Sequence, residues 1–501
     1  MKILKLGSVG PSVELLQLAL GRAGARSLAP DGIFGNATKA ALRTFQSDNG
    51  LAADGVAGPA THRALMPYYT GFASHRIHRG DTLFALSQLY NVPLSAILTA
   101  NPGIAPEKLA VGSSVVIPLP FDIVPTNISF TSALVSYCVR GIAARYPFVK
   151  TGQIGKSVMG RPLWYLSIGE GEKSVFYNAS HHANEWITVP LLLSFAEKLA
   201  RAYAEGGKIF GRSAKEIYQS AAIYIAPCVD PDGVDLVTGE LTGGEFYDGA
   251  VRIAQSYPNI PFPSGWKANL RGVDLNLNYP ANWDKAKQIK ASLGFDRPAP
   301  RDYPGEKPLD QRETAALAAY TACVRPGLLL AYHTQGRVIY PGGAALDQTA
   351  KTGDENKYPM PHTKLSGNPL DMSFSGLKTA ALNLIHTHEQ RGEALDIPSL
   401  CASFSKAVSE MLVPRTMQAL KESGYKKLAI AGGVAANSRI RADFKAACES
   451  LGAALYTPPL SLCGDNGAMI SSQGYYEFLA GTRAGQDLNA FATRSIEQPY
   501  E

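Results

Sequence analysis

A short internal repeat near the N-terminus constrains the fold of this chain more than any other feature. The pattern Asp-Gly-x-x-Gly-x-x-Thr-x-x-Ala-Leu begins at Asp31 and recurs at Asp54, 23 residues later. A repeat at a fixed period indicates one supersecondary unit that occurs twice. Each copy predicts an Asp-Gly turn followed by a threonine that caps a short helix. Because apolar residues also recur at helical spacing between positions 13 and 20, we expect a three-helix module over about residues 3–68.

This module resembles the peptidoglycan-binding domain 1 family. The residues that carry the resemblance are Leu16 with Gln17, the segment Asp31–Gly35, and Phe45 with Gln46. Taken singly, each of them could serve only to build helices and turns, but the doubled pattern favours the family. The resemblance implies an all-α domain over residues 1–69 that binds peptidoglycan.

Residues 75–119 form a second small unit. A strand is followed by a cap at Gly80-Asp81-Thr82, and we then expect helices over Leu83–Tyr90 and Leu94–Ala100 and a strand over Ser114–Pro118. Its Gly80-Asp81-Thr82-Leu83 and Asn101-Pro102 resemble the LysM family, which implies binding to glycans that contain N-acetylglucosamine. The alternative is a βααβ packing unit with no ligand. We interpret the proline-rich stretch from Pro118 to Pro125 as a linker.

Composition and charge exclude several classes of protein. Hydrophobic residues make up 46% of the 501 residues, which excludes a mainly disordered chain. The net charge of +6, from 48 basic and 42 acidic residues, is too small to favour nucleic acid as the main partner. No apolar run approaches 18 residues and the start MKILKLGSVG lacks an apolar core, so we expect no membrane partner and a cytoplasmic protein. The six cysteines are scattered without a CxxC, which argues against thiolate metal clusters and disulfides.

From about residue 131 the pattern predicts an α/β enzyme. Buried strands are expected at Ser174–Tyr177, Ala222–Ala226 and Gly327–Tyr332, with a helix over Leu191–Tyr203.

Three residues of this segment are candidate metal ligands. His182 and Glu185 are three residues apart on a turn that leads into a helix, and His333 follows a buried strand. Two imidazoles and one carboxylate with an open fourth position are a ligand set of catalytic zinc sites. Alone, a His-x-x-Glu pair is also common on ordinary helix surfaces. We therefore predict a Zn²⁺ site that depends on all three residues.

Motifs around these residues resemble the M14 zinc carboxypeptidase family. They occur in the family's order over about residues 127–340, at Gly160–Leu163, Asp230–Gly233, Gly272–Asn278 and Tyr332–Gly336. The resemblance is to the γ-D-glutamyl-L-diamino acid endopeptidase I type, which implies hydrolysis of γ-D-glutamyl–diaminopimelate bonds in peptidoglycan stem peptides. We expect a cytoplasmic protein, and the resemblance implies association with the spore or mother cell as an alternative.

Two departures from this family concern substrate binding and the general base. The family's Asn-Arg pair for the substrate's terminal carboxylate stands here as Asn276 with Leu277, which favours an endopeptidase. Arg271 or Lys267 could bind a substrate carboxylate or carbonyl oxygen, or could simply be solvated on the surface. No glutamate after His333 lies in the apolar context that the family's general base requires. The peptidase domain therefore looks incomplete and its base is unassigned, so we expect the chain to be weakly active or inactive.

Residues 341–501 resemble a different enzyme, the C-terminal half of the tRNA N6-threonylcarbamoyladenosine synthase transferase subunit. The carrying motifs are Ser373–Thr379, Gly432–Ser438 and Cys463–Met469.

The residues themselves predict a strand that runs into a glycine turn. Gly432 and Gly433 could cradle phosphate or an adenylate through backbone N–H groups, or could form only a tight turn. The resemblance implies an α/β lobe of the ASKHA type, in which Asn437 contacts the adenylate and Asp465 binds a metal. Fe²⁺ is expected there only if the missing half of the site were supplied, because the chain has no His-x-x-x-His motif.

The sequence thus predicts a multidomain protein with four parts: a small all-α module, a βααβ LysM unit, an incomplete α/β zinc-carboxypeptidase-like domain and a C-terminal α/β lobe. The predicted function is that of a peptidoglycan-binding zinc metallopeptidase. The alternatives are a glycan-binding protein without activity and a tRNA-modifying threonylcarbamoyl transferase, with tRNA as a partner only in that case. We interpret the junction near residue 340 as a gene fusion or an assembly artefact.

Overall fold

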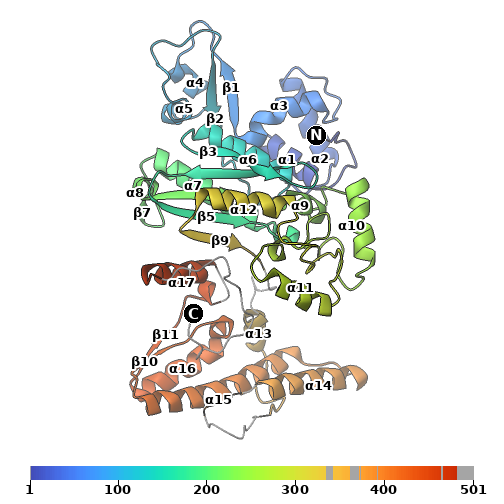
Figure 1. Ribbon diagram of the computed structural model, residues 1–501, viewed down its shortest axis with the longest axis vertical. Coiled ribbons are helices and arrows are strands. Elements are labelled where there is room, and N and C mark those ends of the chain that lie inside the picture. The colour runs from blue at the N-terminus through green and yellow to red at the C-terminus, as the bar shows by residue number, and fades with distance from the viewer. Residues whose placement is uncertain are drawn as a thin grey trace. The chain divides into compact units, whose positions relative to one another are not determined.

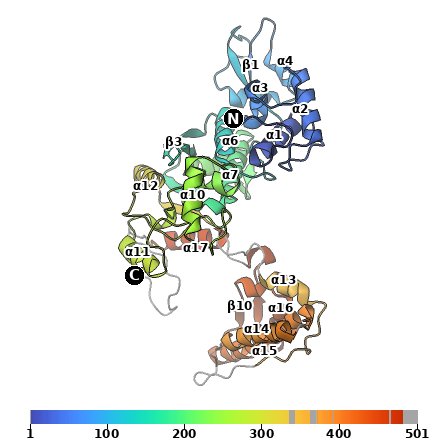
Figure 2. The same ribbon diagram turned by 90° about the vertical axis from the view of Figure 1, so that its right-hand side faces the viewer.

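The computed structural model describes residues 2–334, 342–361, 370, 372, 374–391, 393–463 and 467–481. The chain forms two compact units, and the boundary between them follows Thr334 (Figures 1 and 2). The helices and strands of the first unit are α1 (Pro11–Arg22), α2 (Asn36–Asp48), α3 (Pro59–Thr70), β1 (Phe72–Arg76), α4 (Leu83–Leu89), α5 (Leu94–Ala100), β2 (Ser114–Pro118), α6 (Ser132–Arg145), β3 (Lys150–Lys156), β4 (Pro162–Ile168), β5 (Lys173–Ala179), α7 (Thr188–Ala204), β6 (Lys208–Ile209), β7 (Arg212–Ser213), α8 (Ala214–Ser220), β8 (Ala221–Ala226), α9 (Pro231–Val237), α10 (Glu245–Gln255), α11 (Trp283–Ser292), α12 (Arg312–Val324) and β9 (Leu328–Tyr332).

The N-terminal module is a three-helix unit, and a buried glutamine organises each copy of its repeat. The side-chain nitrogen of Gln17 lies 2.7 Å from Asp31 Oδ1 and 3.0 Å from Thr38 Oγ1, and its oxygen accepts the N–H of Gly32 at 2.9 Å. Gln46 makes the corresponding bonds in the second copy, to Asp54, Thr61 and the N–H of Gly55. Gly32 and Gly55 have φ of 74° and 73°, a conformation that favours glycine. The sequence repeat is therefore a repeat of one hydrogen-bond network.

The prediction that the repeated threonines cap their helices is wrong. The residues that precede α2 and α3 as caps are Gly35 and Gly58, and neither Thr38 nor Thr61 stands at that position. Each threonine lies inside the first turn, where its hydroxyl is buried and accepts a hydrogen bond from the glutamine. Each threonine lies three residues after the cap position, where its hydroxyl bonds to the distant glutamine and not to the first N–H groups of its own helix.

The second small unit has the predicted order of elements. β1 pairs antiparallel with β2, and α4 and α5 pack beside them around a core that includes Ile77, Leu86 and Ile97. Thr82 caps α4 by accepting the N–H of Ala85 at 3.0 Å. Among the described residues no single helix is long and apolar enough to cross a membrane, although α4 and α5 meet that test together as a pair bent by 114°.

The stretch between Pro118 and Pro125 is packed against the body that follows it. Arg145 on α6 donates to the carbonyl oxygens of Gly71, Leu119 and Phe121 at 2.8–2.9 Å. Glu197 on α7 accepts the backbone N–H groups of two further residues of the stretch, at 2.8 and 3.0 Å. The predicted linker is thus fixed to two helices by charge-assisted hydrogen bonds.

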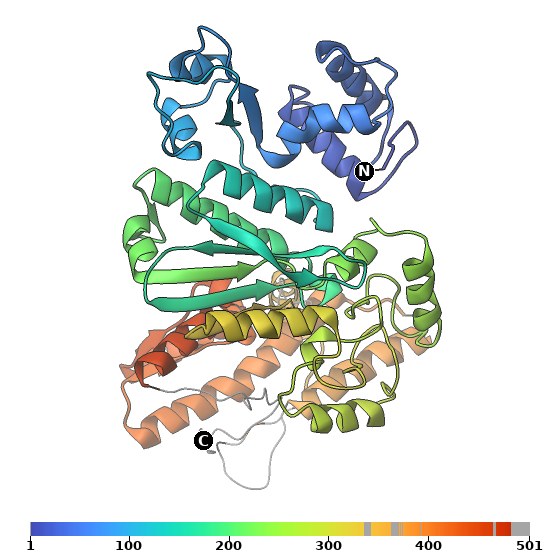
Figure 3. The same ribbon diagram turned by 45° about the horizontal axis from the view of Figure 1, so that its top comes forward.

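Within the part of the chain that the structure describes, the α/β body is built on a five-stranded sheet with the order β3-β4-β8-β5-β9. β8, β5 and β9 are parallel, and β3 and β4 run antiparallel to their neighbours. The helices α6 and α7 cover one face, where Val139, Leu193 and Ile225 join the main core (Figure 3). On the other face, α12 packs Leu317 against Phe176. The strands predicted at 174–177 and 222–226 lie inside β5 and β8.

The second unit contains α13 (Gly342–Ala350), α14 (Ser375–Arg391), α15 (Ile397–Ser423), β10 (Lys427–Ala429), α16 (Ser438–Leu451), β11 (Ala454–Tyr456) and α17 (Gly467–Leu479) (Figure 1). β10 and β11 pair in parallel, and α16 connects them. The predicted glycine turn follows β10, where Gly432 has a φ of 88°. It leads through a short 3₁₀ segment to Asn437, which caps α16.

We predict that replacing Gln46 with leucine destabilises the N-terminal module locally. The change leaves the buried N–H of Gly55 and the Thr61 hydroxyl without their partner, at a cost of about 2 kcal/mol. Amide hydrogen exchange within residues 46–61 should then accelerate by about thirtyfold. The neighbouring exposed change Ser47→Ala should leave the exchange rate unchanged. Equal rates in both variants would show that the network does not hold the module together.

Candidate functional site

The candidate site lies at the carboxyl edge of the parallel strands. His182 and Glu185 lie on the turn after β5, and His333 follows β9 directly. β5 and β9 are neighbours in parallel register, with Ala179 opposite Tyr332, so the residues after both strands meet at one edge of the sheet. Ser180, with a φ of 54°, turns the chain sharply after β5.

The three predicted ligand residues converge on one point. The Nδ1 atoms of His182 and His333 each lie 2.9 Å from one carboxylate oxygen of Glu185, on Oε1 and Oε2 respectively. The two Nδ1 atoms are 3.3 Å apart. The side chain of Glu185 is 1% exposed and that of His333 is 27% exposed, so the group is buried on the protein side and open on the other. Two imidazole nitrogens and a carboxylate in this arrangement suit a zinc ion with a free coordination position.

A glycine and an aspartate support the turn that carries these residues. Asp230 precedes α9 and accepts the N–H of Gly233, and its own N–H donates to the carbonyl oxygen of Ser180. A Cβ at Gly233 would lie 2.7 Å from the Cβ of Ala183, so the close approach of α9 to the turn requires glycine here. The Asp-Pro-Asp-Gly motif therefore packs against the candidate site.

Asp274 completes the site from the far side of His182. Its Oδ1 lies 3.2 Å from the Nε2 of His182, and its Oδ2 accepts the N–H of Asp302 at 3.0 Å. Burial opposes the charge on His182, but the hydrogen bonds with Asp274 and Glu185 outweigh it and raise the pKa of this imidazole to about 9. Burial would likewise raise the pKa of Glu185, but both imidazoles hold it well below its usual value.

Asp274 lies in the motif Gly272–Asn278, but no role was predicted for it from the sequence. The sequence signal for this residue is an aspartate that directly follows a valine in the motif Gly272–Asn278. The contact between Asp274 and His182, however, joins residues that are 92 positions apart.

His181 is buried beside this group without joining it. Its Nε2 lies 3.0 Å from the hydroxyl of Tyr279, and its Nδ1 has no hydrogen-bond partner among the described residues. Burial and the two neighbouring histidines lower the pKa of His181 to about 3, so this imidazole is neutral at physiological pH.

The three predicted substrate-binding residues differ in their burial and in their distance from the candidate site. Lys267 is 5% exposed, and its Nζ lies 3.7 Å from Glu185 Oε1, so it belongs to the candidate site and is not a solvated surface residue. Burial lowers the pKa of Lys267, although the carboxylate of Glu185 opposes this shift. Arg271 and Asn276 are exposed on the same loop, and their backbone N–H groups donate to Asn269 and Asp274.

The predicted adenylate-binding residues lie in the second unit. Asn437 is 4% exposed; its Oδ1 caps α16 through the N–H of Ile440 and its Nδ2 donates to Ser405. A Cβ at Gly432 or Gly433 would meet no atom of the described residues within 4 Å, so this turn is open toward that part of the chain. The predicted metal ligand Asp465 lies outside the described residues.

Family comparisons match three segments of the chain. The zinc carboxypeptidase family (Peptidase_M14) matches residues 136–396, a peptidoglycan binding domain (PG_binding_1) matches residues 9–65, and a LysM domain matches residues 75–118. The first match runs past Thr334, where the first compact unit ends.

Individual relatives fall into two groups. The chain is 37% identical over 318 residues to gamma-D-glutamyl-L-diamino acid endopeptidase 1 of Lysinibacillus sphaericus, covering 53% of this chain and 79% of that protein. It is 43% identical over 162 residues to tRNA N6-adenosine threonylcarbamoyltransferase of Caldicellulosiruptor saccharolyticus, covering 32% of this chain and 48% of that protein. The chain thus spans about half the length of this second relative.

Among solved structures, bovine thrombin-activatable fibrinolysis inhibitor is similar to this chain. The match has 19% sequence identity and a TM-score of 0.30, and it covers 44% of this chain and 70% of that protein. A TM-score this low carries no conclusion. The family match covers more than half of this chain, and the curated endopeptidase is covered over most of its length. The chain therefore belongs to the M14 zinc carboxypeptidase family, with a peptidoglycan-binding domain and a LysM domain ahead of its peptidase segment.

Proposed function

We propose that this chain is a zinc peptidase that acts on peptidoglycan stem peptides, at the γ-D-glutamyl–diaminopimelate bond. The observation that carries the proposal is the convergence of His182 Nδ1, His333 Nδ1 and the Glu185 carboxylate at the edge of the sheet. The name of the Lysinibacillus relative, an endopeptidase for γ-D-glutamyl-L-diamino acid bonds, supports the choice of substrate.

In this proposal His182, Glu185 and His333 hold Zn²⁺, which would polarise the scissile carbonyl and lower the pKa of a bound water. Asp274 orients His182 by holding its Nε2, as outer partners of metal-binding histidines do. Lys267, at 3.7 Å from Glu185, offers its ammonium group to a carbonyl or carboxylate oxygen of the substrate. Arg271 and Asn276, exposed on the adjacent loop, would contact parts of the substrate further from the reacting bond.

We propose that the peptidase domain of this chain is incomplete and spans residues 127–340. Within the described residues, the carboxylates that contact the two histidines belong to Glu185 and Asp274, and each already holds an imidazole. β9 is an edge strand of the described sheet, yet its sequence Leu-Leu-Leu-Ala-Tyr is that of a strand covered on both sides, and Leu329 is 42% exposed. Both features support a domain that lacks its further strand and its general base.

The two N-terminal domains, placed at residues 1–69 and 75–119, would bind the glycan strands of peptidoglycan. They would keep stem peptides at a high effective concentration near the peptidase segment, because both lie in the same compact unit as that segment. We expect this activity in the cytoplasm, with association with the spore or mother cell as an alternative.

A second candidate function rests on the similarity of part of the chain to the threonylcarbamoyltransferase. We place the similar segment at residues 341–501, as an ASKHA-type lobe with Asn437, Gly432 and Gly433 toward an adenylate and Asp465 toward Fe²⁺. The side-chain oxygen of Asn437 already accepts the N–H of Ile440 as the cap of α16, so it is less available to a ligand. Transfer of a threonylcarbamoyl group to tRNA by the purified chain would favour this candidate, and we expect none.

The pH dependence of zinc binding tests the candidate site. Because the pKa of His182 is raised to about 9 without metal, its imidazole must lose a proton when zinc binds near pH 7. Apparent zinc affinity should therefore rise with pH until about pH 9, with release of about one proton in calorimetry at pH 7. Asp274→Asn should weaken zinc binding by about 10–100-fold and reduce the proton release. Zinc binding that is independent of pH and of Asp274 would contradict the assignment.

Peptidase activity should be weak and should depend on the metal ligands. Loss of a general base costs about 10²–10⁴-fold, so we expect a turnover number below about 0.1 s⁻¹ on a γ-D-glutamyl–diaminopimelate peptide. The residual rate should disappear in His182→Ala. A rate near 10 s⁻¹, about the median for enzymes, would show that the chain supplies its own base.

Binding to the cell wall should be separable from catalysis. We expect the purified chain to sediment with insoluble peptidoglycan, and His182→Ala to sediment equally, because the binding domains do not contain the candidate site. Sedimentation in both proteins with no hydrolysis in either would favour the glycan-binding alternative over a peptidase.

A further inference from the structure

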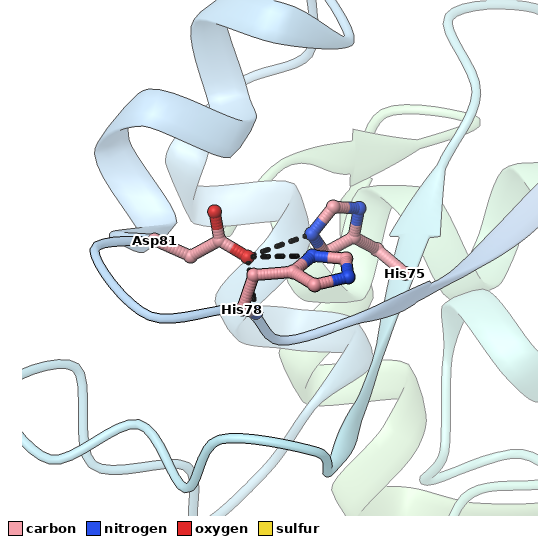
Figure 4. A group of neighbouring side chains, drawn as sticks. All are labelled: His75, His78 and Asp81. Carbon is pink, nitrogen blue, oxygen red and sulfur yellow. Dashed lines mark hydrogen bonds and ion pairs between the residues drawn. The ribbon is translucent and has the colours of Figure 1, made fainter.

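A second group of side chains that could hold a metal ion lies in the LysM domain, apart from the candidate zinc site. His75 is near the end of β1, His78 follows in the loop, and Asp81 directly precedes Thr82, the cap of α4 (Figure 4). One ligand atom from each residue lies within 4.8 Å of the other two. In Figure 4 both imidazoles face the Asp81 carboxylate from the same side.

The distances between these atoms suit a shared ion. Asp81 Oδ2 lies 2.9 Å from His75 Nε2 and 3.6 Å from His78 Nδ1. In a tetrahedral site with bonds of about 2.0–2.1 Å, neighbouring ligand atoms are about 3.3 Å apart. The two distances lie on either side of this value, and the ligand atoms of all three residues lie within 4.8 Å of one another.

Tyr90 prepares His75 for this role. Its hydroxyl lies 3.1 Å from the Nδ1 of His75. If Nδ1–H donates to this hydroxyl, the lone pair of Nε2 points at the carboxylate of Asp81, and two acceptors 2.9 Å apart need a proton or a cation between them. The backbone N–H of His78 also donates to Asp81 Oδ2 at 2.7 Å, which holds this carboxylate beside the two imidazoles.

We propose that His75 Nε2, His78 Nδ1 and the Asp81 carboxylate bind a divalent transition-metal ion of the Zn²⁺ class. Two imidazoles and one carboxylate are borderline ligands that suit Zn²⁺, Ni²⁺ and Cu²⁺ and disfavour Ca²⁺ and Mg²⁺. The side chain of His78 is 72% exposed, so the ion would exchange with solvent and keep water in its open position. Bound metal would tie the end of β1 to the start of α4. This site does not depend on the proposed peptidase function.

The test is zinc titration of the tag-free, full-length chain carrying His182→Ala, which disables the first candidate site. We expect one equivalent of Zn²⁺ to bind, and the additional change His78→Ala to weaken this binding by more than about tenfold. His388→Ala is the matched control, because His388 pairs with Glu393 at 3.7 Å and belongs to neither metal-binding group. It should leave the affinity unchanged. No zinc binding in the His182→Ala chain, or equal affinity after His78→Ala, would overturn the proposal.

A second variant separates metal binding from a purely structural histidine–aspartate cluster. Tyr90→Phe removes the hydroxyl beside His75 and leaves all three ligand residues in place, so zinc affinity should fall by about tenfold. If His182→Ala does not fold, the same comparison is made on the second equivalent of zinc bound by the otherwise unaltered chain. A second equivalent that is insensitive to both His78→Ala and Tyr90→Phe would contradict the site.

Discussion

The buried carboxylate of Glu185 is the constraint on which the candidate site depends. An ionised carboxylate that is 1% exposed is unfavourable unless positive charge and hydrogen bonds surround it. His182, His333 and Lys267 supply them from three separate parts of the chain. The parallel pairing of β5 with β9 is what allows this, because it brings the residues after both strands to the same edge. A change in the register of β9 would separate His333 from Glu185 and leave the carboxylate without one of its two imidazoles.

The parts of this site that could be predicted from sequence are those set by local pattern. The spacing of His182 and Glu185 and the position of His333 after a buried strand identified the three residues that the structure brings together. The role of Asp274 could not be predicted, because its contact with His182 joins residues 92 positions apart through an irregular loop. For the same reason the sequence could not separate Lys267, which is buried against Glu185, from Arg271, which is exposed.

The N-terminal domains show the same limit in a different form. The helices and turns of the repeat were predictable from its apolar spacing and its Asp-Gly pairs, but the threonines were misassigned as caps. Their actual partners, Gln17 and Gln46, lie 21 and 15 residues away in the chain. The stretch after the LysM domain was predicted as a linker from its prolines. It is instead held by Arg145 and Glu197, because two charged side chains on α6 and α7 satisfy its backbone groups.

The central claim is that His182, Glu185 and His333 hold one zinc ion, and anomalous diffraction at the zinc edge tests it most directly. In crystals of the zinc-loaded chain, we expect an anomalous difference peak about 2.0–2.2 Å from His182 Nδ1, His333 Nδ1 and a carboxylate oxygen of Glu185. The same peak should be absent in crystals of His182→Ala. A fully loaded protein without a peak at these three residues would contradict the account.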